Sequence, residues 1–214
     1  MLLNQFIDHT LLKPTATPEE IIQFCHEAIE HQFYAVCIHS CYAHLAVETL
    51  RHERVKVAVT VGFPLGAMCT EGKVSEAQKC VEEGVDEIDM VLNIGFLKAG
   101  LTKSVREEIS AVKHVMGNKV LKVIIETCYL TDEEKKLACT IAQKAGADFI
   151  KTSTGFGPGG ATLKDVLLMK EVVGSKLKIK ASGGIKTGKE AIEYIAQGAS
   201  RIGTSNGIHL LKTQ

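Results

Sequence analysis

Two lysines in strand-like segments are the side chains best suited to covalent chemistry. Lys151 follows the apolar pair Phe149-Ile150 and precedes the small and polar residues 152–155. A lysine inside a buried strand is partly desolvated, which favours its neutral amine, and a neutral amine can attack a carbonyl carbon and form an imine. On this local pattern alone, a structural lysine that snorkels from the strand end or pairs with a carboxylate explains Lys151 equally well.

A second lysine, Lys180, changes this balance. It lies in the next strand-like segment, residues 178–184, on the same face as Lys178 because side chains alternate along a strand. If Lys180 points into the same interior as Lys151, its charge further favours the neutral form of Lys151. Packing does not explain two interior lysines on adjacent strands, since their charges repel. We therefore interpret Lys151 as a nucleophile and Lys180 as the residue that tunes it.

A candidate acid/base group precedes these lysines in the chain. Asp89 lies between apolar residues of the segment 87–93, so we expect it to be buried. A buried carboxylate requires a cation or hydrogen-bond donors, and Lys151 and Lys180 would form a proton-transfer set with it. A structural salt bridge is the alternative. Glu126, at the end of an apolar run, is a weaker candidate for the same network.

The elements that must position these residues alternate regularly. Apolar runs such as 55–61 and 121–125 favour strands buried on both faces, as in a parallel sheet covered by helices. Eight β/α units without a linker predict an α/β fold, a (β/α)8 TIM barrel with a single domain over residues 1–214. A doubly wound sheet is the alternative, but residues 12–15 after the first strand lack the glycines of a dinucleotide site. The strands are expected to begin near Phe6, Ala35, Lys56, Glu87, Leu121, Phe149, Lys178 and Arg201.

The expected helices have recognisable ends. Threonine is a favoured N-cap, and Glu134 follows one such threonine by three residues, as in a capping box. Glycines at positions 84, 146 and 198 close three helices before the next strand in similar phrases. The candidate N-caps are Thr17, Thr102, Thr131, Thr162 and Thr187.

Two glycine-bearing loops predict an anion site. In barrels, phosphate is often bound after the last two strands by backbone N–H groups and a helix N-terminus. Here these positions hold Ser182-Gly183-Gly184 and the segment 203–207. Glycine lets the backbone approach an anion closely. One Gly-Gly pair is usually only a turn, but two such loops at this location favour phosphate.

Composition excludes several other functions. The 214 residues carry 25 basic and 25 acidic side chains, so no net field attracts nucleic acid. We expect no membrane association and a cytoplasmic location, because the start lacks a basic signal region and the seven scattered cysteines suit reduced thiols. The segment Cys37-Ile38-His39-Ser40-Cys41 lacks a second ligand pair, so no metal or other cofactor is expected.

Along essentially its whole length, the chain resembles the deoxyribose-phosphate aldolase family. The segment 147–155 around Lys151 is the most specific match. Six matching segments in the same order are stronger evidence than any one of them. The matching segments are 7–12 (Ile-Asp-His-Thr-Leu-Leu), 62–66 (Gly-Phe-Pro-Leu-Gly), 86–91, 121–127, 147–155 and 180–185.

The resemblance implies a role for each matching residue. The imine-forming lysine falls on Lys151, the second lysine on Lys180 and the acid/base aspartate on Asp89. Residues that match phosphate or substrate contacts are Gly183, Gly184, Ser205, Asn206, Thr154 and Asp8. The implied reaction reversibly splits 2-deoxy-D-ribose 5-phosphate into acetaldehyde and D-glyceraldehyde 3-phosphate. The implied partners are therefore small phosphorylated sugars and aldehydes, and the family implies a homo-oligomer, a dimer or a tetramer.

The chain departs from some family members at three places. Phe156 stands where some carry a lysine, and Asn206 stands where a second serine is common. Some also have a longer tail that ends in a tyrosine, whereas this sequence ends at Gln214, which puts a tail-assisted proton step in doubt. Two other functions stay open: another Schiff-base sugar-phosphate aldolase or transaldolase, and a non-catalytic phosphate-binding barrel.

Overall fold

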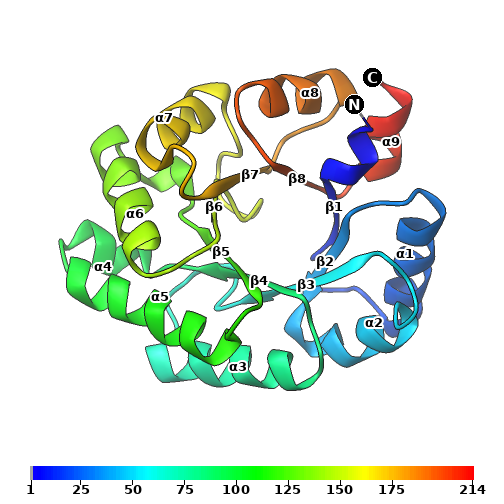
Figure 1. Ribbon diagram of the computed structural model, residues 1–214, viewed down its shortest axis with the longest axis horizontal. Helices are drawn as coiled ribbons and strands as arrows, with labels where there is room; N and C mark the ends of the chain where they lie inside the picture. The colour runs from blue at the N-terminus through cyan, green and yellow to red at the C-terminus, as the bar shows by residue number, and fades with distance from the viewer. Residues whose placement is uncertain (1) are drawn as a thin grey trace.

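Eight parallel strands close into a barrel in the order of the chain, and helices surround it (Figure 1). The computed structural model describes residues 2–214. The strands are β1 (Ile7–Leu11), β2 (Ala35–His39), β3 (Lys56–Val61), β4 (Glu87–Val91), β5 (Val120–Ile124), β6 (Phe149–Lys151), β7 (Lys178–Ser182) and β8 (Arg201–Thr204). Each begins within one residue of its expected start, and the closed barrel confirms the (β/α)8 fold.

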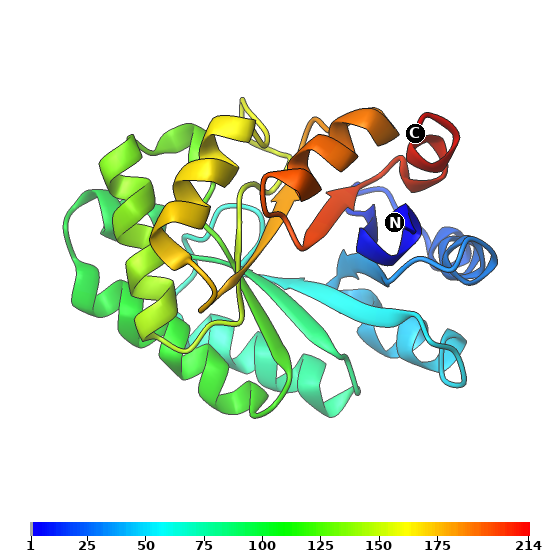
Figure 2. The same cartoon turned by 45° about the horizontal axis from the view of Figure 1, so that its top comes forward.

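The helices follow the strands along the chain. Each long helix covers the outside of the barrel beside the strands that flank it (Figures 1 and 2). Within residues 2–214, none of the helices is long and apolar enough to span a bilayer. The α-helices are α1 (Pro18–Glu30), α2 (Ala43–Thr49), α3 (Thr70–Glu82), α4 (Ile94–Lys98), α5 (Thr102–Met116), α6 (Asp132–Lys144), α7 (Leu163–Val173), α8 (Gly188–Ala196) and α9 (Gly207–Lys212), and the 3-10 helices are η1 (Leu3–Phe6), η2 (Ser40–Tyr42) and η3 (Thr127–Tyr129).

Four of the five expected N-caps are confirmed. Thr17, Thr131 and Thr187 form complete capping boxes, and Thr162 accepts a hydrogen bond from the backbone N–H of Asp165. The prediction for Thr102 was wrong, because Thr102 is the first helical residue of α5 and Leu101 is its N-cap. Gly100, with a φ of 73°, turns the chain between α4 and α5, and α5 begins one residue earlier than expected.

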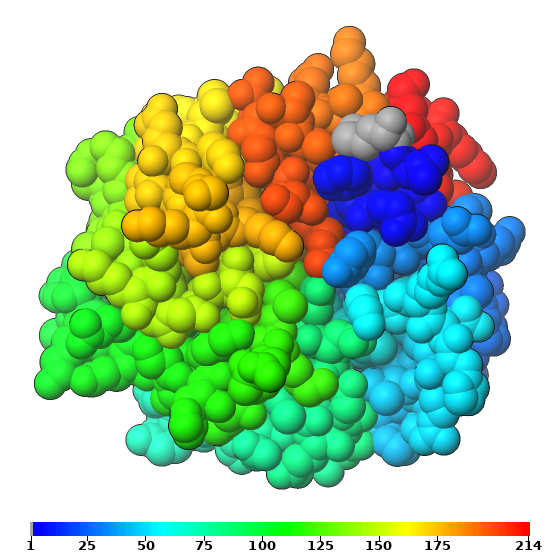
Figure 3. Space-filling view, viewed as in Figure 1, coloured from blue at the N-terminus to red at the C-terminus, as the bar shows by residue number. Residues whose placement is uncertain are grey.

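The two ends of the chain complete the same side of the barrel. The helix η1, drawn in blue, lies beside α9, drawn in red, and the two are in contact (Figure 3). Strand β1 also pairs with β8 through the register of Asp8 with Gly203. The first and last strands therefore close the barrel by backbone hydrogen bonds, which removes the sheet edges that an open sheet would expose.

The main apolar core lies outside the barrel, between the strands and the helices. Along β4, Ile88 and Met90 face this core, so the alternate residues Glu87 and Asp89 face the interior. Barrel interiors are commonly filled by branched apolar side chains. Here a small apolar cluster of Leu12, Cys37 and Ala58 is separate from the main core. Much of the remaining interior is charged.

Candidate active site

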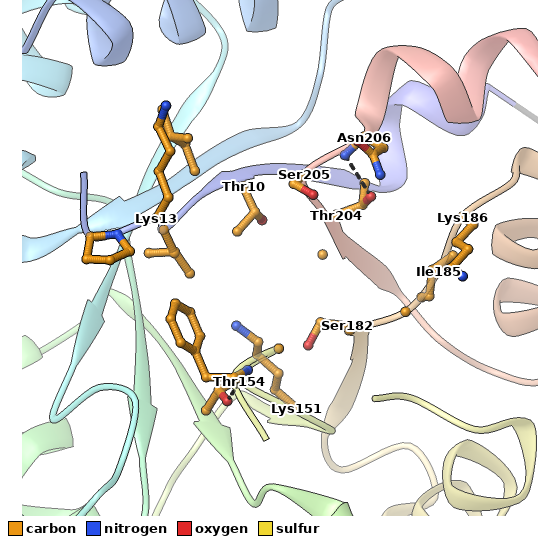
Figure 4. Close-up of a pocket in the computed structure, with 18 residues that line it drawn as sticks. Thr10, Lys13, Lys151, Thr154, Ser182, Ile185, Lys186, Thr204, Ser205 and Asn206 are labelled. Carbon is orange, nitrogen blue, oxygen red and sulfur yellow. Dashed lines mark hydrogen bonds between the residues drawn. The ribbon is translucent and has the colours of Figure 1, made fainter. Parts of the chain in front are cut away.

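A cavity of about 600 Å³ opens at the carboxyl ends of the strands (Figure 4). Loops after β1, β6, β7 and β8 supply its wall, which agrees with the usual position of active sites in this fold. Lys151, Ser182 and Ser205 lie around the same open space, whereas the side chain of Lys13 extends away from it. The lining residues are 10–14, 151, 154–156, 182–186 and 203–206.

Lys151 ends β6 and connects this cavity to the barrel interior. Its side chain is buried, and Nζ donates a hydrogen bond of 2.8 Å to Oδ2 of Asp89. The parallel register places Lys151 directly beside Lys180 of β7. The side chains of both lysines point into the barrel and reach Asp89, so the condition for Lys180 to act on Lys151 is met.

Asp89 lies between the two lysines and offsets their repulsion. Its Oδ2 also accepts a hydrogen bond of 2.7 Å from Lys180, and its Oδ1 accepts one of 2.7 Å from Lys122 of β5. Three lysines therefore share one carboxylate. Asp89 and Lys180 are fully buried beneath Lys151 and do not line the cavity.

Three charged residues in this interior were missed by the sequence reasoning. Lys122 contacts Oε2 of Glu87 at 2.5 Å, and Arg201 contacts Oε1 of Glu87 at 2.9 Å. The Arg201 guanidinium also stacks on the ring of Tyr34, 3.4 Å from its centroid. The sequence held a signal for Glu87 and Lys122. Glu87 shares one face of a strand with Asp89, and Lys122 interrupts an apolar run.

Asp8 occupies a different place from the expected one. It does not line the cavity; it is fully buried below it, where Oδ2 lies 2.5 Å from Lys180 and Oδ1 lies 2.5 Å from Arg201. The reason is the strand period, which turns Asp8 inward at a level below the end of β1. Together the charged residues form the interior ion cluster: Asp8, Glu87, Asp89, Lys122, Lys151, Lys180 and Arg201.

The cluster keeps Asp8 and Asp89 ionised. Burial alone would raise the pKa of Asp89, but Lys122, Lys151 and Lys180 hold that pKa well below its usual value. Burial opposes ionisation of Asp8 as well, yet Lys180, Arg201 and Lys122 lower its pKa to about 2. Burial would likewise lower the pKa of Lys180, but Asp8 and Asp89 raise it above the ordinary value, so Lys180 stays charged.

Glu126 does not join the ion cluster, contrary to the weaker expectation. Its carboxylate accepts hydrogen bonds of 3.2 Å from the backbone N–H of Thr154, and it also binds the Thr154 hydroxyl. Glu126 is buried and adopts a left-handed backbone conformation with a φ of 49°, which is uncommon for a residue other than glycine. It therefore fixes the start of the loop after β6, next to Lys151.

The residues expected to bind phosphate line the cavity, and so does Thr154, which was expected to line the substrate cleft. Gly183, Gly184, Ser205, Asn206 and Thr154 are all in its wall. The Gly183 loop is held from behind by the loop after β6, because the N–H of Ala161 donates to the carbonyl oxygens of Ser182 and Gly183 at 3.1 and 3.0 Å.

Gly160 makes this contact very close. A Cβ added at Gly160 would lie 2.2 Å from the carbonyl oxygen of Gly183, which a real side chain does not tolerate. The two loops therefore pack backbone against backbone.

Phe156 supplies an apolar part of the wall. Its ring is half exposed and packs edge-on against Phe63, with ring centroids 5.3 Å apart.

Within residues 2–214, no three His, Cys, Asp or Glu side chains are grouped so that they could hold a metal ion. The cavity and the interior below it bring together a buried amine, a carboxylate and a second ammonium group.

The pKa of Asp8 predicts a loss of stability in acid. Its pKa falls from 3.8 to about 2 on folding, so the unfolded chain binds the proton first as the pH drops. The free energy of unfolding should therefore decrease by about 2 kcal/mol between pH 4 and pH 2 through this group.

Carbon NMR of the Asp8 carboxyl group, with urea unfolding at both pH values, measures the effect. In Asp8→Asn this component should vanish, although the variant is less stable at neutral pH. A titration midpoint near 4 for the wild-type carboxyl group would contradict the assignment.

Comparisons with known proteins show the family of this chain. The model of the DeoC/LacD aldolase family matches residues 3–213. A deoxyribose-phosphate aldolase of Thermococcus gammatolerans is 55% identical over 99% of this chain and 96% of its own length, and one of Finegoldia magna is 53% identical over 99% and 100%. The solved structure of the deoxyribose phosphate aldolase from Aeropyrum pernix has a TM-score of 0.89 and 32% identity, covering 98% of this chain and 89% of its own. This chain belongs to the DeoC/LacD family of aldolases.

Proposed function

We propose that this protein is a class I aldolase, a lyase that reversibly cleaves 2-deoxy-D-ribose 5-phosphate into acetaldehyde and D-glyceraldehyde 3-phosphate. One observation carries the proposal. Of the seven side chains in the interior ion cluster, Lys151 alone reaches the cavity wall, across from the glycine-bearing loops. An amine at one end and an anion site at the other suit a substrate with a carbonyl group and a distant phosphate. The names of the close relatives support the same substrate.

The reaction begins at the aldehyde carbon C1 of the open-chain sugar. Neutral Lys151 attacks C1, and loss of water from the carbinolamine gives a protonated imine. The C3 hydroxyl group then loses its proton while the C2–C3 bond breaks, and the bonding electrons pass to C2 and the imine as an enamine. D-glyceraldehyde 3-phosphate leaves. Protonation of C2 and hydrolysis of the imine release acetaldehyde and regenerate the amine.

Asp89 and Lys180 serve proton transfer in this scheme. Asp89 is ionised and lies 2.8 Å from Nζ of Lys151, so it accepts a proton from the attacking amine. Lys180 contacts the same Oδ2 and compensates the charge. Because neither residue lines the cavity, a water molecule would carry the proton between this pair and the substrate carbon. Asp8 positions Lys180 from below.

We also propose binding roles for residues of the cavity wall. Backbone N–H groups of Gly183 and Gly184, with Ser205 and Asn206, would hold the phosphate. Thr154 lies next to Lys151 and is fixed by Glu126, so we assign it to the carbonyl end of the substrate. Anchoring the phosphate would place C1 beside the amine and reduce the entropic barrier.

Two alternatives are tested by a substrate panel. A different Schiff-base aldolase or transaldolase would act on another sugar phosphate, such as fructose 1,6-bisphosphate, and leave deoxyribose 5-phosphate intact. A non-catalytic phosphate-binding barrel would bind these compounds without turnover.

Lys151 should carry the covalent adduct. Incubation with acetaldehyde followed by borohydride reduction should add one ethyl group, and peptide mapping should locate it on Lys151. Lys151→Ala should keep the fold and lose at least about 10³-fold in turnover, because the neighbouring Lys180 stays charged and Lys13 and Lys186 of the cavity wall are exposed. Lys178→Ala, which removes an exposed lysine at the start of β7, is the matched control and should retain activity. An adduct on a different lysine would refute the nucleophile.

Gly160→Ala should weaken phosphate binding specifically. The added methyl group must displace the Gly183 carbonyl group, so KM for deoxyribose 5-phosphate should rise about tenfold while the acetaldehyde adduct on Lys151 still forms. Gly95→Ala is the control, since its Cβ would lie at an ordinary 3.5 Å from Asn93. An unchanged KM in Gly160→Ala, with the fold intact, would argue against phosphate at this loop.

We also propose that the protein forms a homo-oligomer, a dimer or a tetramer, and acts in the cytoplasm. The Aeropyrum pernix relative is described as a tetramer, which supports assembly. The seven cysteines are unpaired, which suits a reducing compartment. Light scattering coupled to size-exclusion chromatography should give a mass of two or four chains at micromolar concentration. A monomer mass at all concentrations would refute the oligomer.

A further inference from the structure

The interior ion cluster has an uneven charge count. It contains four cations, namely Lys122, Lys151, Lys180 and Arg201, against three carboxylates, namely Asp8, Glu87 and Asp89. Fully ionised, it carries one excess positive charge in a region almost without solvent. Loss of one proton leaves it neutral, and the proposed nucleophile requires that one amine be neutral.

Carboxylate contacts are distributed unequally among these cations. Lys122 lies within 4 Å of three carboxylates, with distances of 2.5 Å to Glu87, 2.7 Å to Asp89 and 3.9 Å to Asp8. Lys180 and Arg201 each contact two. Lys151 contacts only Asp89, through the oxygen that Lys180 shares. The lysine with the least carboxylate contact is therefore the one in the cavity wall.

We propose that Lys122 and Glu87, which do not line the cavity, are positioning residues that set the pH range over which Lys151 reacts. This inference rests on the proposed aldolase function. Lys122 occupies Oδ1 of Asp89, so that Oδ2 faces Lys151 and Lys180. Glu87 in turn neutralises part of the Lys122 charge and ties it to Arg201. The two residues thus act on Lys151 through Asp89 with opposite sign.

Burial makes this effect strong. Lys122 has no exposed surface and Glu87 is 2% exposed, so water does not screen their charges from the rest of the cluster. Burial alone would lower the pKa of Lys122, but Asp89 and Glu87 raise it, which keeps the positive charge in place. Lys122 is therefore a fixed positive charge next to Asp89, and Glu87 contacts it at 2.5 Å.

The other groups around Lys151 do not replace them. Cys37 of β2 is a neutral thiol, because burial raises its pKa, and Thr60 of β3 is uncharged. Glu126, after β5, is engaged with Thr154. Lys13 and Lys186 are exposed in the cavity wall, where solvent screens their charges. The remaining charges that face Lys151 belong to the interior ion cluster.

Two neutralising substitutions should shift the pH profile in opposite directions. Lys122→Met removes a positive charge, which favours protonated Lys151, so the acid limb of kcat/KM against pH should move up by about one pH unit or more. Glu87→Gln removes a negative charge, so the same limb should move down. The double variant Lys122→Met/Glu87→Gln removes one charge of each sign and should lie near the wild type.

The rate of reductive trapping of acetaldehyde on Lys151, measured against pH, provides a readout that does not require sugar cleavage. It should shift in the same directions. Lys135→Met is the matched control, because Lys135 contacts Asp165 at 2.6 Å between α6 and α7, outside the barrel interior. This control should be less heat-stable with an unmoved acid limb.

The outcomes separate this inference from the proposed function. A wild-type protein without cleavage or without an adduct on Lys151 would refute the function itself. A wild type that reacts as proposed, together with variants whose limbs stay in place or move in the same direction, would overturn the inference alone. If Lys122→Met does not fold, Glu87→Gln decides: a downward shift supports the inference and an unmoved limb overturns it.

Discussion

Asp89 is the group on which the site depends, because three buried lysines donate to its two oxygens. Removing charges from water costs several kcal/mol for each ion, and contact with an opposite charge must compensate that cost. Loss of one partner of such a buried pair typically costs about 3–5 kcal/mol. Removal of Asp89 or of one of its lysines would therefore leave a buried charge without its partner and destabilise the barrel. Because burial of these charges costs free energy, the cluster is better explained by a role in reactivity than by a gain in stability.

The rest of the fold accommodates this charged interior. Strand alternation sends Ile88 and Met90 to the apolar core beneath the helices and leaves Glu87 and Asp89 inside. The apolar stabilisation thus comes from the outer layer, between strands and helices, and the interior is free to carry charge. Closure of the barrel by β1 and β8 then brings Asp8 within reach of Lys180, although these residues are far apart in the chain.

Much of this architecture could be predicted from the sequence, because it depends on local patterns. Strand-like runs located the start of every strand to within one residue, and threonines marked four N-caps, one of which was predicted as a capping box. Lys151, Lys180 and Asp89 could be selected because each interrupts an apolar strand. Lys122 interrupts a strand in the same way, but its run was interpreted as apolar, so the third lysine on Asp89 was missed.

The level at which a side chain lies in the barrel interior was harder to predict than whether it points inward. Asp8 and Lys151 both point inward, yet Asp8 lies under the cavity and Lys151 lies in its wall. The difference depends on the stagger of neighbouring strands around the closed barrel, which pairs Asp8 with Gly203 and Lys151 with Lys180. Loop contacts were also beyond local patterns, since Glu126 meets Thr154 only after β5 and β6 are paired.

The stagger also separates two tasks within the same interior. The lower level holds Glu87, which contacts both Lys122 and Arg201, and none of these three residues lines the cavity. At the upper level, Lys151 is the one member of the interior ion cluster that reaches the cavity wall. Asp89 belongs to both, with Oδ1 bound from below by Lys122 and Oδ2 bound by Lys151. A change of charge at the lower level can therefore affect the amine of Lys151 through Asp89, without a change in the shape of the cavity.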